Sequence, residues 1–546
     1  MVTTVRIEYS EAGRRQVDAT QRLKKLLNNP KLVVIALFAS FGGFEYGYQQ
    51  GVLGQSLVMR RFSDNFPTVV ESSSATGWLT SVLQLGGILG SISAGVLGEV
   101  FSRKYTMFSA CCWVIFGSYL YVGLGVGTFS GVGPLYNAEL SAPELRGTLV
   151  SFYQFATILG IMLSFWVGYG STYIGGTGES QSDLAWRLPS IIQGIPAVCL
   201  AFGIWWLPFS PRWLVKQGRD LKAVKTLAWL RKLPEDHELI QLEYKEIKAE
   251  CIFEKLAFEK SFPALGSKED TSIWVREFAQ YYNIVRTWDN FKRVATAWLV
   301  MFFQQWSGID SIIYYASSVF ETLGLTGGTT ALLATGVTGV VFFVSTLPAM
   351  AIIDKVGRKP MLYVGSVVMF ISMVAAGVIV AKFGHDWVEH AAAGWIAVAF
   401  IWVYVGAFGA TWGPVSWTLV SEIFPLSIRA KGASIGASSN WVNNFAIAFF
   451  VPPMFRTWAW GTYIFFSVFL AGGMVWVWLC LPETKNASLE DMDKIFKSHT
   501  GEADAELFQE ARRQAGLDIG LGEESVDNIG GKPVFEEKRD QHIEMA

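Results

Sequence analysis

The sequence is short of charge, histidine and cysteine. Only 16% of its 546 residues are charged, and it has five histidines and five cysteines. A formal net charge of −2 provides no basic surface of the kind that binds nucleic acid. The cysteines lack the spacing of a disulfide framework or a zinc site, and the histidines form no cluster. We therefore expect no nucleic-acid partner, no metal and no cofactor.

Glycine-rich segments are present, but they lack the other parts of a phosphate loop. The strings GGTGES (175–180) and GVGTFSG (125–131) have no Lys followed by Ser or Thr. Neither lies in a strand-turn-helix setting. Both are better explained as span ends and close-packed helix faces, so no enzyme is predicted.

Apolar residues are abundant, and they are arranged in long runs. Hydrophobic residues make up 51% of the chain, which includes 22 Trp. A run of about 20 such residues crosses about 30 Å of hydrocarbon. The runs predict an all-α polytopic membrane protein with two six-helix bundles, nominally 12 spans, in which the third and fourth spans are shortened. The expected parts are an N-terminal segment (1–31), an N-terminal bundle (32–208), a charged helical connector (209–294), a C-terminal bundle (295–481) and a polar tail (482–546).

Basic residues cluster at alternate span ends, which predicts the orientation. Lys and Arg resist translocation, so the ends that carry them are expected in the cytosol, together with the connector and both termini. The first thirty residues contain no apolar core, so no cleaved signal peptide is expected. From about residue 494 the chain is rich in Gly and Glu, and we expect no ordered structure there.

The two halves repeat a pattern of charges. In each half an acidic residue precedes an arginine by four positions, and later a glutamate precedes an arginine by seven. Matched points in one order predict an internal duplication, as in transporters whose bundles rock against each other. The charges are expected to act as a gate, pairing across the halves when the cytosolic side is closed; the alternative is loop anchoring at the headgroups. The gating residues are Glu99, Arg103, Glu139 and Arg146 in the first half, and Asp354, Arg358, Glu422 and Arg429 in the second.

Eight short strings occur in one order along the chain: GVLGEVFSRK (95–104), PLYNAELSAPELRG (134–147), PFSPRWL (208–214), QQWSGIDSIIYY (304–315), DKVGRK (354–359), GPVSW (413–417), SNW (439–441) and PETK (482–485). Together they resemble the sugar porter family of the major facilitator superfamily, in particular its fungal members. The resemblance covers about residues 30 to 490. It implies transport of a monosaccharide across the plasma membrane by alternating access.

A sugar site needs amides or carboxylates for the hydroxyls and aromatic rings for the CH groups. Polar side chains inside a membrane bundle are costly, so each needs a function. The alternative function is to hold helices together by hydrogen bonds. The candidates for substrate binding are Gln154, Gln304, Gln305, Asp310, Tyr314, Trp417, Asn440 and Trp441, with Asn444 a weaker candidate.

The resemblance implies much of the same set. It places Gln154, Gln304, Gln305, Trp417 and Asn440 in the sugar pocket. Asp310 stands where the family usually has Asn, and Gly413 with Pro414 matches a flexible kink.

Gln305 and Asp310 would point apart on an unbroken helix. They are five positions apart, which is about 140° around the axis. They can converge only if the helix unwinds between them, where Gly308 lies. Discontinuous helices are a recurring way of building sites at the membrane midplane.

Proton coupling is an open question in the sequence. Proton-coupled members of the family usually carry an aspartate in the first span, but this chain has Gln49 there, which cannot titrate. Glu45 and Asp310 are the remaining candidates for proton coupling. Each is equally consistent with a structural, hydrogen-bonded carboxyl, so proton coupling and facilitated diffusion both stay open.

The third and fourth spans have little room. Only 36 positions separate Arg103 from Glu139, or about 17 for each span. The Gly-Arg pair that sugar porters usually carry at the start of the fourth span is absent. We expect either a cramped hairpin or an impaired protein, and an error in the gene model would produce the same pattern.

Three functions fit these observations. The first is a sugar transporter; the second is a carrier of another polyhydroxy solute such as quinate, against which Asp310 counts slightly because quinate is an anion. The third is a transporter-like nutrient sensor, for which the tail after Lys494 is short.

Overall fold

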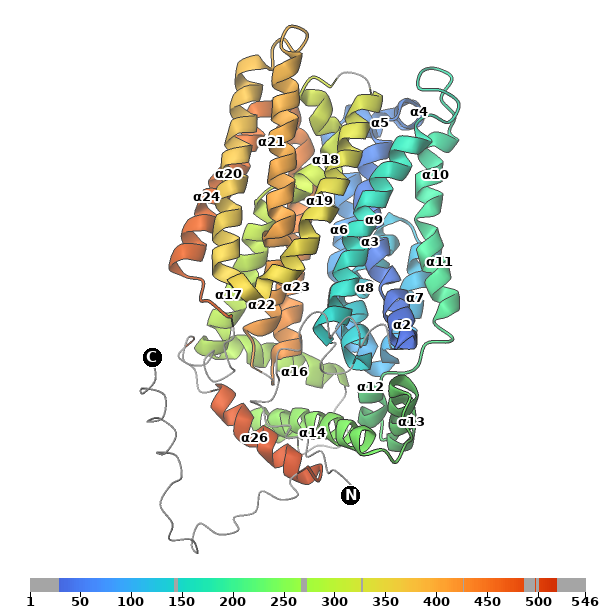
Figure 1. Ribbon diagram of the computed structural model, residues 1–546, viewed down its shortest axis with the longest axis vertical. Coiled ribbons are helices and arrows are strands. Elements are labelled where there is room, and N and C mark those ends of the chain that lie inside the picture. Colours follow the sequence, from blue (N-terminus) through green and yellow to red (C-terminus); the bar gives the residue numbers. More distant parts are fainter. Residues whose placement is uncertain are drawn as a thin grey trace, which may run out of the picture.

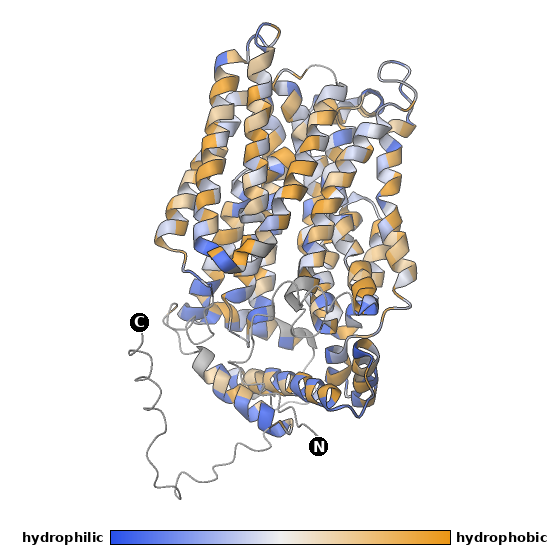
Figure 2. Ribbon diagram, in the orientation of Figure 1, coloured by the Kyte–Doolittle hydropathy of each residue, from blue (hydrophilic) through white to orange (hydrophobic). Residues whose placement is uncertain are grey.

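Upright helices form two groups side by side, with further helices lying across one end (Figure 1). The computed structural model describes residues 29–141, 146–266, 273–325, 328–425, 427–485, 496 and 500–517. Orange, apolar residues dominate the upright helices, and blue, polar residues are concentrated in the helices across the end (Figure 2). This distribution confirms the predicted class, an all-helical membrane protein. We call the end with the transverse helices the connector end and the opposite end the far end.

The first group of upright helices is the N-terminal bundle. Its first pass is broken at Ser40, and its sixth pass changes helix at Gln193. Two short helices, α4 and α5, lie between the first two passes. The bundle consists of α2 (Pro30–Ala39) with α3 (Phe41–Ser56), then α6 (Ser73–Val100), α7 (Ser102–Phe116), α8 (Tyr119–Leu140), α9 (Arg146–Ser171), and α10 (Leu184–Ile192) with α11 (Gly194–Gly203); α4 is Arg60–Asn65 and α5 is Pro67–Glu71.

The C-terminal bundle has the same number of passes. Its first and fourth passes are each divided into two helices. The bundle consists of α17 (Trp288–Trp306) with α18 (Ile309–Thr322), then α19 (Gly328–Val356), α20 (Arg358–Phe383), α21 (Ala391–Ala410) with α22 (Trp412–Glu422), α23 (Arg429–Thr457) and α24 (Ala459–Leu479).

Seven of the described segments are long and apolar enough to cross a membrane by themselves. The other five passes are short, broken or richer in polar residues. These twelve passes agree with the predicted layout. The α7–α8 hairpin is as cramped as expected, because α7 has only 15 residues and Gly117 and Ser118 alone separate it from α8.

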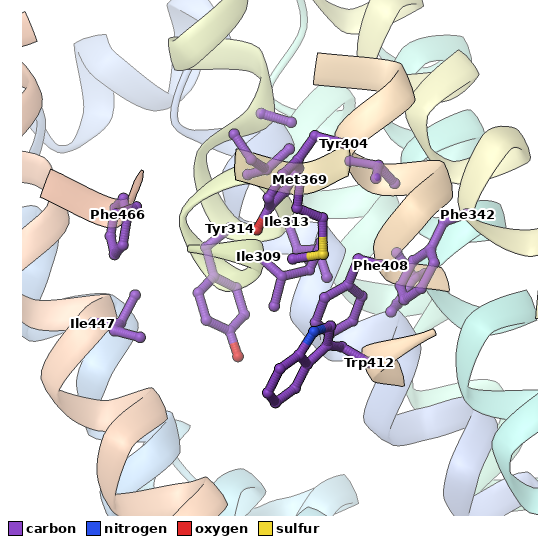
Figure 3. Close-up of a cluster of buried hydrophobic side chains, with 14 of the residues drawn as sticks. Ile309, Ile313, Tyr314, Phe342, Met369, Tyr404, Phe408, Trp412, Ile447 and Phe466 are labelled. Atoms are coloured by element: carbon purple, nitrogen blue, oxygen red, sulfur yellow. The ribbon is translucent and has the colours of Figure 1, made fainter. Parts of the chain in front are cut away.

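Glycine allows α6 and α8 to pack closely inside the N-terminal bundle. A Cβ atom added at Gly123 would lie 2.0 Å from the carbonyl oxygen of Leu83. Small residues at helix contacts are the usual means by which membrane helices approach each other, because lipid provides no hydrophobic drive for association. The core of the C-terminal bundle instead uses large side chains such as Phe408, Trp412 and Phe466 (Figure 3).

Five helices form the connector, and a further helix follows the last pass. The expectation that the tail has no ordered structure was wrong for part of it, because Thr500–Gln514 forms α26. This helix packs against α14 through the rings of Phe253 and Phe508, whose centroids are 5.7 Å apart. The prediction missed it because its apolar residues are few. The connector helices are α12 (Pro211–Lys216), α13 (Asp220–Arg231), α14 (Glu238–Ser261), α15 (Pro263–Gly266) and α16 (Ile273–Arg286).

Candidate functional site

The break between α17 and α18 positions three of the predicted site residues. Gly308 has φ of 97°, a left-handed conformation that costs glycine little. Gln304 and Gln305 are the last polar residues of α17, and Asp310 lies in the first turn of α18. The predicted unwinding between Gln305 and Asp310 is therefore confirmed.

A pair of amides lies at the end of α17. Asn440 of α23 donates from Nδ2 to Oε1 of Gln304 at 2.9 Å. Gln304 in turn donates from Nε2 to the carbonyl oxygens of Trp412 and Gly413, at 3.0 and 3.4 Å. The carbonyls lie beside the α21–α22 break at Thr411 (φ −133°, ψ −83°), two residues before Gly413, where the resemblance to sugar porters implies a kink. Two interrupted helices and α23 thus meet at one cluster of amides.

Several polar atoms near this cluster have no partner among the described residues. They are Oε1 of Gln305, Oδ2 of Asp310 and Oδ1 of Asn440, on side chains that are no more than 5% exposed. Buried polar atoms are nearly always hydrogen-bonded, so each such atom requires an explanation. Acceptor oxygens of this kind can receive hydrogen bonds from the hydroxyls of a ligand.

Tyr314 forms hydrogen bonds to both bundles. Its hydroxyl donates to Oδ1 of Asn444 at 2.9 Å and accepts from Nε2 of Gln84 at 2.9 Å and of Gln50 at 3.4 Å. Its ring is buried beside Ile309 and Ile313 (Figure 3). These bonds connect α18 and α23 to α3 and α6, so Tyr314 holds the two bundles together.

Trp441 also lies between the bundles. Its indole contacts the ring of Tyr46, with centroids 5.2 Å apart, and covers Gly87 of α6. Gln154 on α9 and Trp417 on α22 are only partly buried, and neither side chain makes a hydrogen bond within the described residues. The structure gives Trp441, Gln154 and Trp417 different surroundings, and the contact of these three side chains with substrate stays a prediction.

The far ends of the bundles are in contact. Arg456 donates to the carbonyl oxygens of Val70 and Glu71, and the hydroxyls of Thr80 and Tyr315 lie 2.6 Å apart. The ring of Trp78 packs on Phe449 at 5.0 Å. The structure therefore represents a state closed at the far end.

The charges at the connector end pair within each half. Arg103 contacts Glu99 at 2.8 Å and Glu139 at 2.9 Å, and Arg358 contacts Glu422 at 2.5 Å. These equivalent pairs match the repeat in the sequence, although the gate was predicted to pair across the halves. In a state closed at the far end, the arginines instead connect the helices of one bundle. Arg429 donates to the carbonyl of Phe424, whereas the side chains of Arg146 and Asp354 lie outside the described residues.

Comparison with known proteins identifies the family. The model of the family described as "Sugar (and other) transporter" matches residues 35–496. The chain belongs to this family of transporters.

Two kinds of relatives resemble this transporter over most of its length. A probable quinate permease of Aspergillus niger is 31% identical, covering 87% of this chain and 89% of the permease, and a quinate permease of Emericella nidulans is 30% identical, covering 89% and 92%. The xylose transporter XylE from E. coli, in a partially occluded inward open conformation, has 25% identity and a TM-score of 0.67. The match covers 84% of this chain and 99% of XylE. A structure of the proton:xylose symporter XylE bound to 6-bromo-6-deoxy-D-glucose matches with a TM-score of 0.65.

The two candidates for proton coupling are placed differently in this transporter. Glu45 on α3 is fully buried, and neither carboxyl oxygen has a partner among the described residues. Gln49, one turn along the same helix face, is equally buried, and its side-chain nitrogen and oxygen are both unpartnered there. Asp310 lies instead near Tyr46, Tyr314 and Tyr404 at the helix break.

The sequence interpretation missed three residues around the transporter's centre. Gln50 and Gln84 bind Tyr314, and Trp412 donates from Nε1 to Oγ of Ser366 at 2.9 Å. The glutamines could have been found by the same rule that selected Gln154, namely that intramembrane polar side chains need a function. Trp412 could not, because nothing in its sequence environment distinguishes it from the other tryptophans of an apolar span.

Proposed function

We propose that this transporter carries a monosaccharide, a hexose or a pentose, across the plasma membrane by alternating access. The observation that carries the proposal is the Gln304–Asn440 amide pair at the α17–α18 break, with buried acceptor oxygens of Gln305, Asp310 and Asn440 beside it. A ring of hydroxyls supplies the donors that these oxygens lack.

The repeat of the two bundles supports alternating access. Each bundle is held together at the connector end by an equivalent arginine cluster, around Arg103 and around Arg358. The contacts between the bundles at the far end, including those of Arg456 and Tyr315, can break as the bundles rock. The basic residues at the connector end support a cytosolic position for that end and for both termini.

The charge around the centre favours a neutral solute over an anion. No Lys or Arg occurs between Val294 and Asp354, between Gly432 and Phe455, or between Gly147 and Trp186. An anionic substrate would need a cation or several donors to replace its hydration. Asp310 adds a carboxyl to the same region, which supports a monosaccharide as substrate.

Quinate transport is the second candidate, and the named permeases favour it. It requires the same bundles and uses the same hydroxyl-binding amides. The two candidates differ in how the carboxylate of quinate would be bound, which makes direct competition between the solutes informative.

Proton coupling through Glu45 or Asp310 is part of the proposal. Carboxyl groups buried in a bundle without a cation are typical proton carriers in transporters. Glu45 lacks a partner at both oxygens, and Asp310 at one, within the described residues. Coupling predicts that E45Q or D310N abolishes concentrative uptake and leaves downhill exchange intact.

Uptake of labelled glucose, xylose and quinate tests the proposal in cells without their own carriers for these solutes. Saturable sugar uptake that is not inhibited by quinate would support it, and inhibition by a protonophore would support coupling. Saturable quinate uptake alone would establish the second candidate. No uptake of any of the three, at verified surface expression, would favour a sensor and contradict the proposal.

A variant of the Gln304–Asn440 pair tests whether these amides bind the transported sugar. N440A removes the donor to Gln304, and we expect the KM for sugar to rise about tenfold, which corresponds to about 1.4 kcal/mol of lost binding. N283A is the matched control, because Asn283 lies on α16 and bonds only Ser261 among the described residues, at 3.4 Å. An unchanged KM in N440A would remove the amide pair from the substrate site.

A further inference from the structure

A groove lies at the connector end of the N-terminal bundle, where the first pass begins and the sixth pass ends. One part, of about 560 Å³, is lined by Lys31 at the start of α2, by Lys225, Trp229 and Lys232 of α13 and the turn after it, and by Glu235. A second part, of about 260 Å³, shares Lys225 and Trp229 and extends to Trp206 and Pro208. We call the two parts together the interface groove.

The groove carries excess positive charge. Lys31, Lys225 and Lys232 are exposed, and none of them forms an ion pair within the described residues. Glu235 is the one carboxylate in the lining. Lys222, Lys225, Trp229 and Lys232 recur at helical spacing, so they share one face of α13 and the turn that follows it. The ammonium of Lys31 lies 5.1 Å from the centre of the Trp229 ring.

Hydrogen bonds hold the walls of the groove in place. Asn29, at the start of α2, donates to the carbonyl of Leu230 in α13 at 2.9 Å. Arg231 donates to the carbonyl of Leu140 in α8 at 3.0 Å and pairs with Glu243 of α14. These contacts fix α13 against the start of α2, the end of α8 and α14, so the groove is a shallow, open surface whose lysines are carried on a fixed backbone.

The interface groove lies at the level along the bundle where the membrane surface is expected. The apolar span Leu184–Gly203 ends just before Trp205 and Trp206, whose side chains are 59% and 78% exposed. Exposed tryptophans at span ends lie at the level of the lipid headgroups. Lys31 is the second residue of α2, so the first pass crosses the same level. α13 lies directly below α2 and the end of α11 (Figure 1).

We propose that the interface groove binds the phosphate of an anionic phospholipid headgroup in the leaflet at the connector end. Lysine ammonium groups bind phosphate as point charges, and the indoles of Trp206 and Trp229 pack against the glycerol and upper acyl chain. A soluble phosphate compound shares the same chemistry. The exposed tryptophans favour a lipid, because their indoles would be left uncovered by a soluble anion.

Native mass spectrometry of the full-length protein tests the proposal. Purified protein is stripped of lipid and titrated with phosphatidylserine or phosphatidylcholine. We expect phosphatidylserine to bind more tightly, and the triple variant K31Q/K225Q/K232Q to lose at least fivefold in affinity, since one lysine near an anionic surface is worth about fivefold. Equal retention by the wild type and the triple variant would overturn the proposal.

A matched control distinguishes lipid binding in the groove from a general effect of positive charge. K248Q/K255Q/K260Q removes the same number of lysines from α14, outside the groove lining. We expect this variant to bind phosphatidylserine like the wild type, and a loss equal to that of the groove variant would contradict a specific site. Size-exclusion profiles and melting temperatures in phosphatidylcholine establish that both variants are folded.

Inorganic phosphate distinguishes the two sources of the ligand. If the groove binds a lipid, millimolar phosphate leaves phosphatidylserine retention unchanged. If phosphate binds and displaces the lipid at the same concentration, the groove is a site for a soluble anion and the lipid assignment is wrong. Neither outcome depends on which solute the protein transports.

Discussion

Tyr314 is one side chain on which the contact between the bundles depends. Its hydroxyl has partners on α3, α6 and α23, and all of them are buried. A hydrogen bond contributes about 1 kcal/mol net, and an unsatisfied buried partner costs more than the average bond contributes. The bonds to Gln50 and Gln84 join the two bundles and exist only while the far end is closed. Tyr314 therefore favours the state that is closed at the far end over the open state.

Removing that hydroxyl should favour opening of the far end. For Y314F we expect a loss of about 2 kcal/mol from the closed state, which changes the ratio of closed to open molecules by about 30-fold. Hydrogen exchange in peptides from α6 and α23 would report the opening. Y173F is the control, because the hydroxyl of Tyr173 is exposed and bonds only that of Tyr169 among the described residues. Equal exchange in both variants would show that Tyr314 does not hold the bundles together.

At the scale of the helix, the α17–α18 break is what brings amide groups and a carboxyl together. The break depends on Gly308, whose positive φ is accompanied by close contact with Phe466, 2.7 Å from the position a Cβ would take. A side chain there would be strained by the backbone and by the ring at once.

G308A should therefore destabilise the protein by about 1 to 3 kcal/mol and reduce transport. Melting temperature and sugar uptake are the measurements. G95A in α6 is the matched control, because nothing lies within 4 Å of the Cβ it would add. A helix-compatible alanine there should be neutral or stabilising by up to about 1 kcal/mol. If G308A is as stable as G95A, the α17–α18 break does not require glycine at position 308.

The α7–α8 hairpin is the second element with a measurable consequence. With 15 residues, α7 is about 22 Å long and does not reach across about 30 Å of hydrocarbon. A bilayer must thin beside it, or the polar turn at Gly117 and Ser118 must lie within the lipid. Each ångström of mismatch costs a fraction of a kcal/mol.

The protein should accordingly be more stable in thin bilayers than in thick ones. The measurement is the melting temperature in phosphatidylcholine nanodiscs with acyl chains of about 14 and about 20 carbons, which bracket the ordinary hydrocarbon thickness. A variant with one apolar turn of helix added on each side of Gly117–Ser118 should lose or reverse this preference, whereas an equally long insertion in the loop 384–390 should not. If the melting temperature of the wild type does not depend on bilayer thickness, the short hairpin is not mismatched to the bilayer.

At the scale of the whole molecule, the connector joins the two bundles through ion pairs and through the tail. Lys216 of α12 pairs with Glu99 of α6 at 3.1 Å and with Glu254 of α14 at 2.8 Å. Asp504 of α26 accepts from the backbone nitrogen of Ser427 at 3.0 Å, next to α23. α26 therefore bridges α14, which is attached to the N-terminal bundle, and the C-terminal bundle.

The contacts that join the connector to the bundles should weaken in acid. Burial by itself would raise the pKa of Glu254, but Arg212 and Lys216 outweigh it and hold that pKa below its usual value. A carboxyl with a lowered folded pKa contributes stability above its unfolded pKa, about 4.3, and loses it as the pH falls through the folded pKa. Limited proteolysis of the connector should accelerate below about pH 4 in the wild type.

Two variants establish whether Glu254 causes the acid effect. E254Q should show little further acceleration of proteolysis in acid, because its contribution is already absent at neutral pH. E259Q is the control, since the ion pair of Glu259 with Lys255 is long, at 3.9 Å, and partly exposed. The same acid profile in E254Q as in the wild type would assign the effect to other carboxyls.

The class, the passes and the residues at the helix break follow from the sequence alone, whereas the roles of the candidate site residues stay predictions. Long apolar runs can only be stable in lipid, where the helix satisfies its own backbone, so length and hydropathy were enough to find most of the spans. The repeat of Glu and Arg located both arginine clusters, and Gly308 located the helix break, because these features depend on local chemistry.

The tertiary structure decided which of these groups meet. Composition could not show that Tyr314 would bind Gln50, Gln84 and Asn444, or that Arg103 and Arg358 would pair within their own bundles, because those contacts join residues far apart in the chain. It also could not show that α26 would fold on α14, since a short polar helix is stabilised by packing against a partner and has little stability of its own.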